Sequence, residues 1–170
     1  MIEFEMDKLR KVGIDPGKLG EYQVLCLPEN LESPGAMDEL FDASSTANLS
    51  KRLKSAGLKC ANSFDLGMAV GVIERQAADL WLGLVWILDK FAIPVVVGVV
   101  SALLTSMIQR KSKSKSSTTH RPDPKVHLTL RLLRGRYLTT IKYDGDPETL
   151  NQLLSGLKPD MEYEERQNDR

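Results

Sequence analysis

The pattern of hydrophobic and polar positions predicts four strands along the chain. They are expected at Glu21–Pro28, Leu58–Leu66, Val126–Arg134 and Tyr137–Tyr143. The alternation is clearest in the third, where Val126, Leu128, Leu130 and Leu132 face one way and His127, Thr129 and Arg131 the other. Because a glycine turn signal stands between the third and fourth strands, we expect them to form a β-hairpin.

Two amphipathic helices are predicted beside these strands. The first lies between Asn48, a capping residue, and Gly57, a stop signal. The second begins at Asp146-Pro147, a strong helix start. Its apolar positions, spaced to lie on one face, are Leu150, Leu153, Leu154 and Leu157.

The longest apolar run of the chain is residues 91–109, which read FAIPVVVGVVSALLTSMIQ and carry no charge. As a helix this run is about 28 Å long, close to the roughly 30 Å of a bilayer core. We therefore predict a transmembrane segment within one long helix over residues 67–110. Four basic residues follow the run, so the positive-inside rule places the C-terminal half in the cytoplasm. The chain is therefore predicted to be a single-pass protein of the inner membrane.

Several features of this segment suit a membrane anchor. Small residues allow helices to approach closely, which favours self-association, and a proline costs least in a first turn. The tryptophans of Leu80–Leu88 fit an interfacial helix leading into the span. The residues assigned to the anchor are Trp81, Trp86, Pro94, Gly98, Ala102, Arg110, Lys111, Lys113 and Lys115.

Two other interpretations of the segment stay open. Residues 67–88 and 91–109 could form a helical hairpin, although this would bring Glu74, Arg75 and Asp79 close to a bilayer. Alternatively, the segment is a buried helix of a soluble core. A further conflict arises because strands on both sides of the segment look like parts of one sheet, which a single span would divide.

The predicted fold class is α+β: a small β-α-β N-terminal part, one long apolar helix, and a C-terminal β-hairpin plus helix. The predicted divisions are 1–66 for the N-terminal part, 67–110 for the helix, 111–125 for a basic linker, 126–158 for a cytoplasmic hairpin–helix part, and 159–170 for a charged tail. Cys26 and Cys60 fall in strand-like runs and are expected to be buried free thiols, or a disulfide if their strands are neighbours outside the cytoplasm.

Net charge is zero, but residues 109–142 hold 10 basic residues and one acidic residue. Arginine suits phosphate oxygens, so an anionic ligand such as a nucleotide is a candidate for the hairpin, and lipid headgroup contact is the alternative. The candidate residues are His127, Arg131, Arg134, Arg136 and Lys142. Aromatic residues are too sparse there to favour nucleic acid. The chain has only two histidines and no cysteine or histidine cluster with metal-ligand spacing. We therefore expect no catalytic residue, metal or cofactor, and expect that the chain is not an enzyme.

Residues Lys125–Leu157, with the sequence Tyr-Asp-Gly-Asp-Pro-Glu-Thr-Leu between hairpin and helix, resemble the C-terminal part of "effector-associated constant component" proteins. These are adaptor-like proteins proposed for bacterial conflict systems, with a similar order of elements. The resemblance implies a non-catalytic, membrane-associated partner of an effector in anti-phage defence. We therefore expect a self-associating, membrane-anchored component that binds a protein partner or an anionic signal and could disrupt membranes. The alternative is a soluble adaptor whose apolar helix docks into a partner protein.

Overall fold

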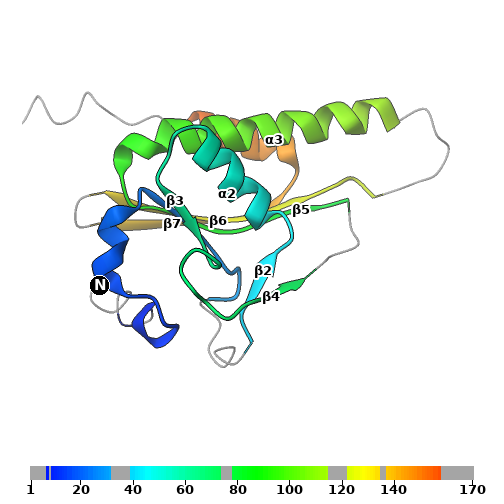
Figure 1. Cartoon of the computed structure of the whole chain (residues 1–170). Helices are drawn as coiled ribbons and strands as arrows, with labels where there is room; N and C mark the ends of the chain where they lie inside the picture. The colour runs from blue at the N-terminus through cyan, green and yellow to red at the C-terminus, as the bar shows by residue number, and fades with distance from the viewer. Residues whose placement is uncertain are drawn as a thin grey trace, which may run out of the picture.

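A five-stranded mixed sheet forms the centre of the protein, and helices lie along one side of it (Figure 1). The computed structural model describes residue 7 and residues 9–31, 39–73, 78–114, 122–134 and 137–157. The strands of the central sheet pair in the order β3 (Cys60–Asn62), β1 (Val24–Leu27), β5 (Leu80–Ile87), β6 (Val126–Arg134) and β7 (Tyr137–Gly145). A separate small sheet pairs β2 (Phe41–Ala43) with β4 (Gly71–Ile73) in parallel.

The helices are α2 (Thr46–Ser55), α3 (Ile93–Ser114) and α4 (Pro147–Ser155), with 3-10 turns η1 (Pro16–Glu21) and η2 (Lys90–Ala92). Helix α4 starts where the sequence predicts, because the Asp146 carboxylate accepts a hydrogen bond from the Thr149 amide at 2.7 Å. The α+β class, the long apolar helix and the C-terminal hairpin followed by a helix are confirmed.

Two hydrophobic cores lie on opposite faces of the sheet. Helices α2, α3 and α4 cover one face (Figure 1), where their leucines and valines pack on the inward side chains of β5 and β6. The N-terminal segment covers part of the other face, through Leu9, Ile14 and Leu19. Sheet residues between these two cores are almost completely buried, and the four residues of β1 have no exposed surface.

The prediction of one helix over residues 67–110 is wrong in its N-terminal half. Residues 71–73 and 80–87 are strands, and the helix begins at Ile93. The interfacial helix over Leu80–Leu88 and the helical hairpin are therefore wrong as well. The physical reason is burial on both faces: Val85 and Ile87 pack in one core, while Leu84 and Trp86 pack in the other. A strand enclosed on both sides reads as a continuous apolar run, which sequence alone does not distinguish from a helix.

Helix α3 is the crossover connection between two neighbouring parallel strands. Strand β5 pairs with β6 in parallel, with Val85 opposite Leu130, and α3 lies between them in the chain. Parallel strands need such a crossover, and a helix usually provides it. If α3 crossed a bilayer, β5 and β6 would lie on opposite sides of it, so a membrane span would require the pairing of these two strands to break.

Candidate functional site

Helix α3 has two distinct faces. Its inner face packs on the sheet, with Ile93, Val96 and Val100 each 2% exposed and Leu104 fully buried. Its outer face consists of residues on successive turns of the helix that point away from the core. They are Pro94, Val95, Gly98, Ala102, Thr105 and Ser106, of which Val95 is half-buried and the others are exposed.

The outer face of α3 carries no charge from residue 94 to residue 109. At Gly98 an added Cβ would meet nothing within 4 Å, so this face is open. Within the described part of the chain, the stretch Lys90–Lys113 is the helix long and apolar enough to cross a membrane, and 28% of its apolar stretch is buried inside the protein. That test rests on length and composition, which core helices of soluble proteins also satisfy.

Basic residues follow the apolar part of α3, as the sequence predicts. Arg110 and Lys113 are exposed, and Lys111 forms an ion pair with Asp123 at 3.3 Å. Lys115 lies outside the described residues. The tryptophans assigned to the anchor are in β5 instead: Trp86 is 2% exposed in the sheet. Their placement removes the aromatic belt from the predicted anchor.

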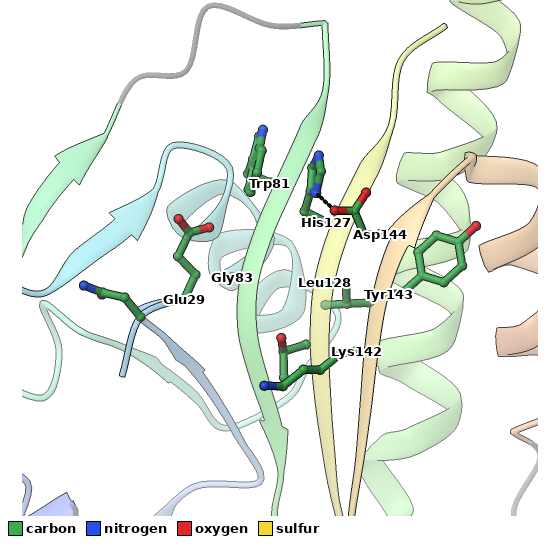
Figure 2. A pocket seen from close by; sticks show the side chains of 10 residues that line it. Glu29, Trp81, Gly83, His127, Leu128, Lys142, Tyr143 and Asp144 are labelled. Atoms are coloured by element: carbon green, nitrogen blue, oxygen red, sulfur yellow. Dashed lines mark ion pairs between the residues drawn. The ribbon is translucent and has the colours of Figure 1, made fainter. Parts of the chain in front are cut away.

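A cavity of about 390 Å³ opens on the sheet face opposite α3 (Figure 2). It lies where β5, β6 and β7 meet the loop that follows β1. Its lining residues are Glu29, Asn30, Trp81, Gly83, His127, Leu128, Thr129, Lys142, Tyr143 and Asp144.

His127 is fixed at this cavity by contacts on every side. Its ring stacks on that of Trp81, with centroids 3.5 Å apart and planes inclined by 11°. Its Nδ1 lies 3.1 Å from an Asp144 oxygen (Figure 2), and its Nε2 lies 3.5 Å from an Asp79 oxygen. The other Asp79 oxygen accepts a hydrogen bond from the Lys125 amide at 2.8 Å, which holds that carboxylate in place.

A β-bulge in β5 allows the Trp81 ring to stack on the His127 ring. Trp81 lies opposite His127 and Gly83 lies opposite Leu128, so Leu82 is an extra residue in β5. The extra residue reverses the alternation and turns Trp81 to the face that also carries Leu84 and Trp86. Gly83 adopts φ +70°, a conformation that glycine accepts without cost.

The predicted anion-binding residues are only partly brought together. His127 and Lys142 line the cavity, whereas Arg131 is buried with its guanidinium 5.7 Å from the Trp86 ring. Arg134 is the last residue of β6, at the end of the strand away from His127; its side chain and Arg136 lie outside the described part.

The charge around the cavity differs from the sequence-based expectation of a basic cluster. The carboxylates of Glu29 and Asp144 line it together with the Lys142 ammonium. The pKa of the Tyr143 hydroxyl is raised, first by burial and then by the negative charge of Asp146. This hydroxyl donates a hydrogen bond to the Asp146 carbonyl oxygen at 2.6 Å. This mixed lining disfavours a multiply charged anion such as a nucleotide, because the carboxylates would repel it.

The two cysteines come together in the core on the α3 side of the sheet. Strands β1 and β3 are parallel neighbours, and the Sγ atoms of Cys26 and Cys60 are 3.7 Å apart as free thiols. The hydrogen bond to Cys60 and burial raise the pKa of Cys26 well above its usual value. Cys26 is therefore held as a neutral thiol inside the core, in keeping with a packing role.

Comparison with known protein families, with curated proteins and with solved structures finds no match for this chain. The arrangement of its own residues is therefore the basis for assigning a function.

Proposed function

We propose that this chain is a non-enzymatic docking module that holds a helix of a partner protein against the outer face of α3. The observation that carries the proposal is the four-turn outer face without a charged residue, beside an inner face already committed to the sheet. A surface helix normally places charged and polar residues on the side away from the core. An uncharged outer face is therefore a surface that a second molecule is expected to cover.

The chemistry of this face favours a helix as its occupant. Gly98 and Ala102 are four residues apart, so they lie one above the other and leave a shallow track for a close helix–helix approach. Val95 beside them supplies an apolar contact. The proposal corresponds to the adaptor alternative expected from the sequence; under the family resemblance, the partner would be an effector.

A non-enzymatic role is supported by the environment of His127. Both of its ring nitrogens face carboxylates, those of Asp144 and Asp79, so neither is directed at a hydroxyl or thiol nucleophile. In the part of the chain that the structure describes, no group of three or more histidine, cysteine, aspartate and glutamate side chains could hold a metal ion. His127 is thus held between two carboxylates, an arrangement that fits a structural role.

Photocrosslinking in the native host cells tests the proposal directly. A benzophenone amino acid placed at Ala102 should give a discrete protein adduct, because this position is on the outer face of α3. The matched control is Ser112, which is exposed on the same helix but beyond the uncharged stretch. Equal adducts from both positions, or no protein adduct from Ala102, would contradict docking on this face.

A membrane role is the second candidate, and it rests on the length and apolar composition of α3 together with the basic residues that follow it. It requires α3 to leave the sheet, which would open the core that Val96, Val100 and Leu104 close. Extraction of host membranes at high pH separates the two candidates. Release of the chain supports docking, whereas retention in the pellet supports insertion.

A further inference from the structure

The central sheet ends in a long strand whose outer edge has no neighbour in the described part of the chain. Strand β7 is the last strand in the order, and it is nine residues long. The opposite edge, β3, has three residues and contacts α2. The unpaired backbone N–H and C=O groups of an edge strand are a template for a further strand.

Strand β7 has few of the features that usually protect an edge. It contains no proline, and its pairing with β6 runs from Tyr137 to Gly145 without a bulge. Tyrosine, threonine and isoleucine, which favour strands, make up five of its nine residues. Its only charged residues are Lys142 and Asp144. Tyr137, at the start of the strand, is 80% exposed.

An apolar groove accompanies this edge on the α3 side of the sheet. It has a volume of about 130 Å³ and is enclosed by β6, β7 and α4. Ile141 and Tyr143 of β7 line it, facing Leu153 and Leu157 of α4, and Leu153 is 53% exposed. A strand added to β7 would therefore extend an apolar surface that is already present next to the edge.

From these observations we infer that β7 pairs in antiparallel fashion with β7 of a second copy of this chain, giving one continuous ten-stranded sheet. This inference is independent of docking on α3, because it uses the sheet edge and α4. A second copy fits because the strand complements itself. With all nine residues paired, Ile141 is the middle residue and lies opposite Ile141 of the second copy.

The charges of β7 are compatible with this register. Lys142 lies opposite Thr140 of the second copy, and Asp144 lies opposite Leu138, so no like charges face each other. Tyr143 lies opposite Thr139, an aromatic–β-branched pair of the kind that stabilises antiparallel sheets. A register centred one residue later would place two Lys142 side chains opposite each other, which is unfavourable.

The first test is the mass of the purified full-length chain in solution. Light scattering after size exclusion should give twice the chain mass of 19.0 kDa. A monomer at all concentrations up to the solubility limit overturns the inference and leaves docking on α3 unaffected. It would point instead to a partner peptide at β7.

The second test reads the register by disulfide formation. Ile141→Cys should crosslink to itself under mild oxidation, because the two positions meet at the two-fold axis. In the matched control Thr139→Cys the two thiols are separated by four residues along the strands, about 13 Å, too far for a disulfide. The native Cys26 and Cys60 are buried and should not contribute.

The result expected is a dimer band for Ile141→Cys and almost none for Thr139→Cys. Equal crosslinking of both variants, or crosslinking of Thr139→Cys alone, overturns the inference. Should Ile141→Cys fail to fold, an equal mixture of Thr139→Cys and Tyr143→Cys replaces it. That mixture should give mainly the mixed dimer, and its absence also overturns the proposed pairing.

Discussion

Leu104→Ala should lower the free energy of unfolding by about 2–5 kcal/mol, the usual cost of removing a fully buried leucine. Leu104 has no exposed surface and belongs to the core between α3 and the sheet. Urea denaturation followed by tryptophan fluorescence measures this effect well. Trp81 and Trp86 are the two tryptophans of the chain, and both lie in β5, so the signal reports on the sheet itself.

The matched control is Ser106→Ala, on the outer face of the same helix. Because Ser106 is exposed, this change should alter the free energy of unfolding by less than about 0.5 kcal/mol. If α3 were a membrane anchor detached from the domain, neither substitution would move the unfolding midpoint of the sheet. Equal midpoints for Leu104→Ala and the wild type would therefore contradict the packing of α3.

Gly83→Ala and Gly98→Ala should change stability in opposite directions. At Gly83 an added Cβ would lie 3.0 Å from the Leu27 carbonyl oxygen and 3.0 Å from the Thr46 hydroxyl, and φ is +70°. Strain and overpacking together should cost about 2–4 kcal/mol. At Gly98, in the open outer face of α3, alanine should raise stability by about 0.5–1 kcal/mol, since glycine is a poor helix former.

Thermal unfolding of the two glycine variants side by side checks this pair of predictions. The Gly83 variant should also lose the near-ultraviolet dichroism of the stacked Trp81 ring, because the bulge that orients this ring depends on Gly83. Equal stability of the Gly83 variant and the wild type would mean that β5 has no bulge there. A loss of stability in the Gly98 variant would mean that another part of the chain covers this face.

Sequence patterns predicted the elements whose periodicity is regular. The β6–β7 hairpin shows clear alternation because one of its faces packs against α3 and α4. Helix α4 has an unambiguous capping residue and an apolar stripe. The segment from Leu80 to Ile87 shows no such periodicity, because β5 packs against a core on each face and its residues are apolar on both sides.

The cavity could be predicted only in part, because its residues come from distant parts of the chain. His127 and Lys142 were candidates by residue type, but Trp81, Asp79 and Glu29 reach the site through strand pairing over long stretches of chain. The bulge at Gly83 also reverses the side to which Trp81 points, which breaks the alternation on which such predictions depend. Arg131 was predicted to reach a ligand because its strand face looked polar, yet that face is covered and its side chain is 5% exposed.

The central claim is that α3 connects two paired strands of one sheet instead of separating them across a bilayer. The most direct measurement is nuclear magnetic resonance of the full chain in aqueous buffer without detergent. The structure predicts cross-strand contacts between β5 and β6 in the parallel register that places Val85 opposite Leu130. Absence of these contacts, with α3 ordered only in micelles, would contradict the claim.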